Sequence, residues 1–118
     1  MNSIKLGKRV INNNSEPYII AEIGVNHNGD INEAKYLIEK ASYGNCKAVK
    51  FQHRSIKLYN SEDINSYDIG TQYIISEIER TRLSIDQLLD CCIFAGNLDL
   101  EVIIIPFDEE ALDEIMRF

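Results

Sequence analysis

A carboxylate and an amine stand near the ends of two short apolar runs in this chain, and both residue types can do chemistry. Glu22 follows one apolar run, and Lys50 follows the apolar pair Ala48 and Val49. Side chains alternate across a strand, so Lys50 shares one face of its strand with Gln52. An acid and a base at the carboxyl ends of neighbouring strands can move a proton or bind an anion. The sequence therefore predicts a site around Glu22 and Lys50, and a structural ion pair between them is the alternative.

A polar loop with a glycine at each end follows Glu22, from residue 24 to residue 29. Asn26 and His27 lie in this loop and could line the same site. Ordinary turn residues are the alternative, since asparagine readily adopts the left-handed conformation that turns require. A single histidine is too little for a zinc site, and the sequence has no glycine-rich phosphate loop and no serine nucleophile motif.

Three basic residues after Lys50, namely His53, Arg54 and Lys57, could add positive charge at the same end of the strand. A solvated loop is the alternative for Lys57. The polar segment 53–71 is long for a connection inside a compact domain, and such segments are usually functional.

Strands and helices are expected to alternate along the chain, which predicts a parallel sheet with right-handed crossovers. Residues 3–11 alternate apolar and polar side chains about Gly7, which indicates a hairpin. Capping residues Asp30, Ser84 and Asp108 each precede a helical pattern, and the first helix ends near Gly44 and Asn45. The predicted strands are 18–23, 47–52 and 101–105, and the predicted helices run from Asp30, over 72–81, over 85–96 and from Asp108 to the C-terminus.

Apolar side chains at helical spacing predict the faces that form the core. The third strand is apolar at four successive positions, Val102 to Ile105, which predicts burial on both faces. The residues expected to face inward are Ile31, Ala34, Leu37, Ile38 and Ala41 in the first helix, and Leu88, Leu89, Cys92 and Ile93 in the third.

The composition favours a soluble cytoplasmic protein. The 118 residues carry a net charge of −7, which argues against nucleic acid or an anionic membrane as the main partner. No apolar run reaches the roughly 18 residues that span a bilayer, and the N-terminus lacks the apolar segment of a secretory signal. The three cysteines lack metal-ligand spacing. Cys91 and Cys92 are therefore expected to be buried apolar residues in a reducing cytosol.

The run from Ile20 to Asp30, followed by the sequence Ala-Val-Lys-Phe-Gln at 48–52, resembles the start of a sialic acid synthase. That family includes the N-acetylneuraminate, legionaminate and pseudaminate synthases and related spore-coat polysaccharide enzymes. The resemblance implies a TIM (β/α)8 barrel, an α/β fold of eight strands and about 250 residues. Residues 1–118 would then be a truncated N-terminal part, with the hairpin and about the first three βα units, and without the family's C-terminal antifreeze-like domain.

The resemblance also implies an activity. The family condenses phosphoenolpyruvate with the open-chain aldehyde of an N-acyl hexosamine, which gives a nine-carbon 2-keto sugar acid and phosphate for surface polysaccharide synthesis. Glu22 and Lys50 would be catalytic, and the two would bind substrate together with Asn26, His27 and Gln52. The cofactor would be a divalent metal, Mn²⁺ or Mg²⁺, with ligands beyond residue 118. A cytoplasmic homodimer is expected for the full-length protein.

Three features depart from the family pattern. Ile104 and Ile105 stand where members carry serine and threonine, and the lost hydroxyl removes one substrate hydrogen bond worth roughly 1–3 kcal/mol. Asn45 and Asp99 stand where glycine is usual, although both tolerate the left-handed conformation. The chain also stops after the third βα unit, so it is expected to be inactive and poorly soluble alone.

Two other functions stay open, a non-catalytic truncated remnant and a barrel lyase or aldolase acting on a sugar acid. The sequence does not specify the N-acyl sugar or the oligomeric state.

Overall fold

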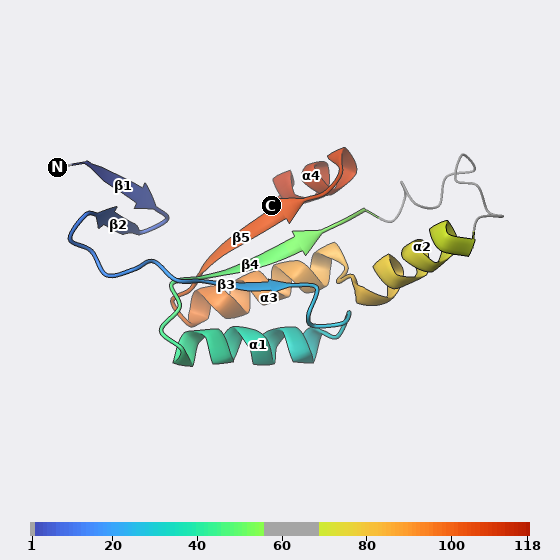
Figure 1. Cartoon of the computed structure of the whole chain (residues 1–118), viewed down its shortest axis with the longest axis horizontal. Helices are drawn as coiled ribbons and strands as arrows, with labels where there is room; N and C mark the ends of the chain where they lie inside the picture. The colour runs from blue at the N-terminus through green and yellow to red at the C-terminus, as the bar shows by residue number, and fades with distance from the viewer. Residues whose placement is uncertain (1, 56–68) are drawn as a thin grey trace.

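The computed structural model describes residues 2–55 and 69–118, which form a small parallel sheet with helices and a separate hairpin (Figure 1). The hairpin pairs β1 with β2, and the parallel sheet has the order β3-β4-β5. The elements are β1 (Ser3–Leu6), β2 (Arg9–Asn12), β3 (Ile20–Gly24), α1 (Ile31–Tyr43), β4 (Ala48–His53), α2 (Ile69–Thr81), α3 (Ile85–Asn97), β5 (Glu101–Pro106) and α4 (Glu109–Met116). The predicted order of strands and helices is confirmed.

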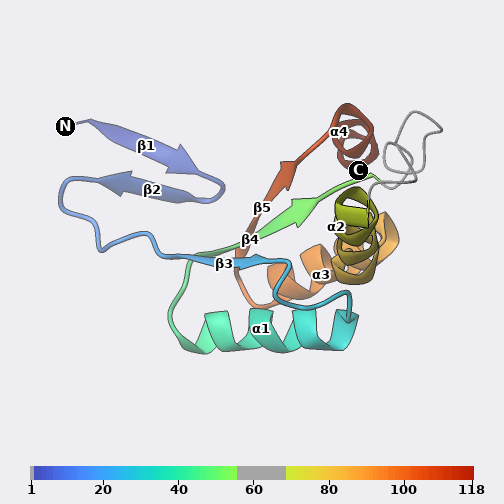
Figure 2. The same ribbon diagram turned by 45° about the vertical axis from the view of Figure 1, so that its right-hand side comes forward.

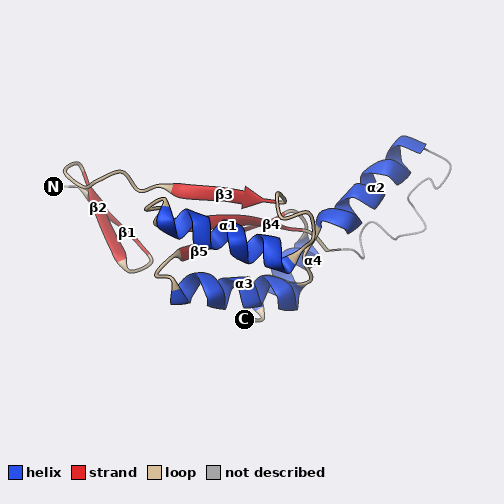
Figure 3. Ribbon diagram, turned by 90° about the horizontal axis from the view of Figure 1, so that it is seen from below, coloured by secondary structure: helices blue, strands red, loops and turns tan. Residues whose placement is uncertain are grey.

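Helices α1 and α3 lie side by side on one face of the sheet, as the view from below shows (Figure 3). We call the opposite face of β3, β4 and β5 the inner face. Val49 and Phe51 of β4 point toward the helices and are fully buried, so Lys50 and Gln52 between and beyond them point to the inner face. Sequential strands joined by helical crossovers, with helices on one side, match the start of a (β/α)8 barrel.

The core between the sheet and the two helices follows the predicted helical stripes, with one exception. The stripe of α3 runs through Leu88, Cys91 and Ala95, and all three are buried. Ile93 is 58% exposed, so its predicted inward position is wrong. The stripe of α1 is confirmed, since Ala34, Ile38 and Ala41 are buried and Ile31 and Leu37 pack against them.

The predicted burial of both faces of β5 is also wrong for this chain. Val102, Ile103 and Ile104 are half-buried, and Ile105 is 38% exposed. The physical reason is that the described residues provide helices for the outer face but no second layer over the inner face at Ile105.

The predicted caps form as expected. Asp30 accepts hydrogen bonds from the backbone of Asn32 and Glu33, Ser84 forms a capping box with Gln87, and Asp108 accepts from Ala111. Asn45 and Asp99 adopt φ values of 60° and 63°, the left-handed conformation that glycine would otherwise supply. Element ends differ by a few residues: β3 begins at Ile20, α2 begins at Ile69, and β5 includes Pro106.

The hairpin is tied to the amino end of β5 (Figure 2). The backbone N–H of Lys8 donates to Glu101 Oε1 at 3.0 Å, and Arg9 Nη2 donates to Asp99 Oδ2 at 2.9 Å. The hairpin thus lies at the end of the sheet opposite the carboxyl ends of β3 and β4. Within the described ranges, every helix is too short or too polar to cross a membrane.

Candidate functional site

Glu22 and Lys50 meet on the inner face, as the sequence predicts. They are partners in the parallel register of β3 and β4, and Lys50 Nζ lies 2.7 Å from Glu22 Oε2. The Lys50 side chain is 34% exposed and the Glu22 side chain 47% exposed. Ion pairs as exposed as this one contribute little to stability, at most about 1 kcal/mol. The pair is therefore open to a ligand, and its role in folding is small.

Gly24 leaves space beside this pair. It has a φ of 57°, and a Cβ at this position would lie 3.4 Å from Glu22 Oε1 and 3.5 Å from Gln52 Nε2. The carboxylate of Glu22 and the amide of Gln52 therefore approach the same glycine. Gln52 is among the site residues predicted from the sequence, and Gly24 is not. A glycine at the end of a strand is a signal for such close approach and could have identified it.

His27 is turned away from the pair and into the core. Its side chain is 2% exposed, and its ring centroid lies 6.1 Å from that of Phe51. The backbone N–H of Gly29 donates to His27 Nδ1 at 3.1 Å. Burial lowers the pKa of His27 below its ordinary value, and a hydrogen bond to the Gly24 backbone partly opposes this shift. His27 therefore holds the loop as a neutral imidazole, and its contact with a substrate stays a prediction.

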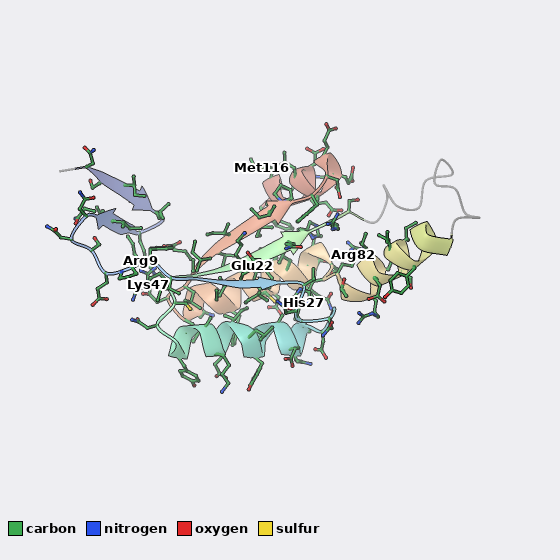
Figure 4. The ribbon with its side chains drawn as sticks, in the orientation of Figure 1. Arg9, Glu22, His27, Lys47, Arg82 and Met116 are labelled. Carbon is green, nitrogen blue, oxygen red and sulfur yellow. The ribbon has the colours of Figure 1, made fainter. Side chains whose placement is uncertain are left out.

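Asn26 closes the turn after β3. Its Nδ2 and its backbone N–H both donate to the carbonyl oxygen of Ile23, each at 2.9 Å. The side chain is exposed, so its predicted contact with substrate also stays a prediction. Figure 4 shows Glu22 on the sheet and His27 in the loop beyond the end of β3.

The basic residues after Lys50 have different positions. His53 is 2% exposed, and its Nε2 lies 2.7 Å from Glu114 Oε2 of α4, so its predicted contribution to the charge beside Lys50 is wrong. Strand alternation explains this, since His53 shares the helix-facing side with Phe51. The guanidinium of Arg54 lies over the ring of Phe107 at 3.9 Å. Lys57 lies outside the described residues.

Strand β5 provides the other wall of the site. In the parallel register Ile103 is opposite Lys50, and Ile105 is opposite Gln52. Ile104 points the other way and lines an apolar cavity of about 200 Å³ with residues of α3 and α4. Ile105 therefore stands on the inner face, where a hydroxyl is expected from the family pattern.

The described residues do not match the expected metal. Within residues 2–55 and 69–118, no three histidine, cysteine or acidic side chains gather where they could hold a metal ion. Burial raises the pKa of the Cys91 thiol to about 11, so it is not a thiolate ligand at neutral pH. We therefore derive no step through a metal.

Comparisons with known proteins identify relatives of one kind. The chain is 31% identical over 113 residues to an uncharacterized protein of Methanocaldococcus jannaschii, which covers 96% of this chain and 31% of that protein. It is 32% identical over 104 residues to the N,N'-diacetyllegionaminic acid synthase of Legionella pneumophila, which covers 81% of this chain and 29% of the synthase. No protein-family model matches the chain.

The fold is also shared with a solved structure. An N-acetylneuraminic acid synthetase of Leptospira borgpetersenii superposes with a TM-score of 0.78 at 24% identity, over 98% of this chain and 38% of that one. This similarity confirms the fold class expected from the sequence. The chain spans about three tenths of the length of the two curated relatives.

Proposed function

We propose, from the premise that this chain belongs to the sialic acid synthase family and matches one segment of it, that the protein carrying it is a phosphoenolpyruvate-dependent synthase. The second substrate is the open-chain aldehyde of an N-acyl hexosamine. The three carbons of phosphoenolpyruvate join the six of the sugar, one water is consumed, and phosphate leaves. The product is a nine-carbon 2-keto sugar acid.

One observation carries this proposal, the half-exposed pair of Glu22 and Lys50 at the carboxyl ends of two adjacent parallel strands. Active sites of (β/α)8 barrels lie at this end of the strands. Phosphoenolpyruvate is strongly anionic, and a positive charge that the fold holds in place stabilises such a ligand. Lys50 supplies that charge on the inner face.

Glu22 is assigned to the aldehyde. Bond formation turns the aldehyde oxygen into an alkoxide, which needs a proton. Glu22 lies within hydrogen-bond distance of Lys50, so the two groups can exchange a proton and deliver one to that oxygen. Gln52 and the space beside Gly24 lie next to Glu22, where the sugar end of the substrate would sit.

A divalent metal, Mn²⁺ or Mg²⁺, and a homodimer belong to the same proposal by family resemblance. Both are tested on the complete polypeptide. Removal of metal with a chelator is expected to abolish activity, and re-addition of Mn²⁺ is expected to restore it.

The direct test is phosphate release by the complete polypeptide that carries this sequence, supplied with phosphoenolpyruvate, Mn²⁺ and N-acetylmannosamine or a related N-acyl sugar. Release is expected only when both substrates are present. A lyase or aldolase would act on the sugar acid without releasing phosphate, and a non-catalytic remnant would release none.

A matched pair of variants links the activity to the site. Lys50→Met is expected to lower kcat/KM by roughly 100-fold or more. Lys35→Met removes a similar ion pair, Lys35 Nζ to Asp90 Oδ2 at 2.8 Å, on the helices away from the inner face. It is expected to leave the activity unchanged. Equal losses in the two variants would contradict the role of Lys50.

A further inference from the structure

Strand pairing continues past the ends of β4 and β5, which places Arg54 on the inner face. The backbone N–H of Phe107 donates to the carbonyl oxygen of His53 at 3.0 Å, one step beyond the pairing of His53 with Pro106. Side chains alternate along a strand, so Arg54 lies on the side of Lys50 and Gln52. Phe107 lies by the same rule on the side of Ile105.

The contact between Arg54 and Phe107 supports this placement. The guanidinium carbon lies 3.9 Å from the centre of the Phe107 ring, and Arg54 is half-buried. Two side chains that stack so closely point to the same side of their strands. A guanidinium stacked on an aromatic face is held in one orientation and still presents N–H donors along its edge, which suits a phosphate or a carboxylate.

The inner face is therefore asymmetric at its carboxyl end. Toward β3 it is polar, with the Glu22 carboxylate next to Lys50. Toward β5 it is apolar, with Ile103 and Ile105 opposite Lys50 and Gln52. Lys50 and Arg54 are four residues apart on one strand, about 13 Å between their Cα atoms, and Gln52 lies midway. Both side chains are long enough to lean toward a small ligand above Gln52.

We propose that Arg54 is a second anion-binding residue of this site, which holds one acidic group of a small substrate with two acidic groups while Lys50 holds the other. The inference rests on the proposed function, because it assigns the carboxylate and the phosphate of phosphoenolpyruvate to two separate cations. Phe107 is the positioning residue that orients Arg54. The aliphatic wall of Ile103 and Ile105 faces the uncharged carbon end of the ligand.

The test is calorimetric titration of the complete polypeptide with phosphoenolpyruvate and, separately, with inorganic phosphate. Arg54→Gln is expected to raise the Kd for phosphoenolpyruvate roughly 10-fold or more, as for other charge-assisted hydrogen bonds. Lys40→Gln is the matched control. It removes one positive charge from α1, where Lys40 lies 5.0 Å from the ring centre of Tyr36, and it is expected to leave the Kd unchanged.

Two further variants separate binding from folding. Arg54→Lys keeps the charge and loses the planar fork, so it is expected to fold and to bind with an intermediate Kd. Phe107→Leu removes the stacked ring and keeps the arginine, so it is expected to weaken binding by a smaller factor than Arg54→Gln. Unchanged Kd values in Arg54→Gln, or equal changes in Lys40→Gln, overturn the inference.

The inference and the proposed function fail in different ways. Binding that depends on Arg54 without phosphate release in the presence of the sugar supports this inference and contradicts the synthase. Phosphate release with an unchanged KM for phosphoenolpyruvate in Arg54→Gln supports the synthase and overturns this inference. Absence of phosphoenolpyruvate binding by the unaltered protein overturns both.

Discussion

His53 at the end of β4 and Glu114 in α4 form a hydrogen bond between groups far apart in sequence, with His53 Nε2 2.7 Å from Glu114 Oε2. The His53 side chain is 2% exposed and the Glu114 side chain 20% exposed. Just beyond Arg54, the backbone N–H of Ser55 donates to Asp108 Oδ2 at 3.0 Å. The chain that carries Arg54 out of the sheet is thus fastened on both sides of Arg54, to α4 and to its capping residue.

Loss of the Glu114 carboxylate is expected to destabilise the fold. Glu114→Ala leaves the buried imidazole of His53 without this partner, which costs roughly 1–3 kcal/mol in the free energy of unfolding. Chemical denaturation followed by circular dichroism measures this change. Asp113→Ala is the control, since Asp113 is an exposed acid on the same helix, and it is expected to change stability by less than about 0.5 kcal/mol. Similar values for the two variants would show that the contact contributes nothing.

Gly29 is expected to tolerate no side chain. Its φ is 78°, and a Cβ would lie 2.3 Å from the backbone oxygen of Arg80, which follows from the packing of the end of α2 on this loop. Gly29→Ala is therefore expected to lower the free energy of unfolding by roughly 2 kcal/mol or more.

Gly96 provides the opposite case for comparison. It lies in α3, and a Cβ there would meet no atom within 4 Å. Gly96→Ala is expected to stabilise the fold by roughly 0.5–1 kcal/mol. Thermal denaturation of the two variants beside the unaltered protein measures both effects, and destabilisation of equal size at both positions would contradict the close contact at Gly29.

The buried His27 is expected to make stability depend on pH. Burial lowers its pKa in the folded state, so the unfolded chain binds more protons between the folded pKa and about 6.5. Stability then rises with pH through this window and is lost as the pH falls through it. The free energies of unfolding of the unaltered protein and of His27→Asn, measured from pH 5 to pH 8, are expected to differ most at the high end of that range. A difference that stays constant with pH would contradict the neutral buried state.

Ile105 is expected to weaken substrate binding compared with a hydroxyl residue. It stands opposite Gln52 on the inner face, so Ile105→Thr introduces a donor beside the proposed anion site. The KM for phosphoenolpyruvate in the complete polypeptide is expected to fall by roughly 5- to 10-fold, as for one added hydrogen bond.

Ile104→Thr is the matched control on the neighbouring residue. Ile104 lines the apolar cavity on the opposite side of β5, so a hydroxyl there is expected to destabilise the fold by roughly 1–2 kcal/mol without lowering the KM. A lower KM in both variants, or in neither, would contradict the position of Ile105 in the site.

The local sequence determined most of the element order of this chain. Caps at Asp30, Ser84 and Asp108 are set by one side chain and the backbone of the next turn, so they can be predicted from spacing alone. The pairing of Glu22 with Lys50 could also be predicted, because strand alternation and parallel neighbours fix which side chains share a face. The run of residues 20–30 is specific enough to indicate the family by itself.

Tertiary structure alone decided the positions of the histidines and of Arg54. His27 and His53 read as candidates for the site, but packing against Phe51 and the contact with Glu114 turn both toward the helices. The distance between Arg54 and Phe107 depends on the register of β4 with β5, which a sequence does not specify when the strands lie far apart along the chain. Contacts of this kind form only when the crossover brings distant strands together, and these contacts decide which of the candidate residues reach the inner face.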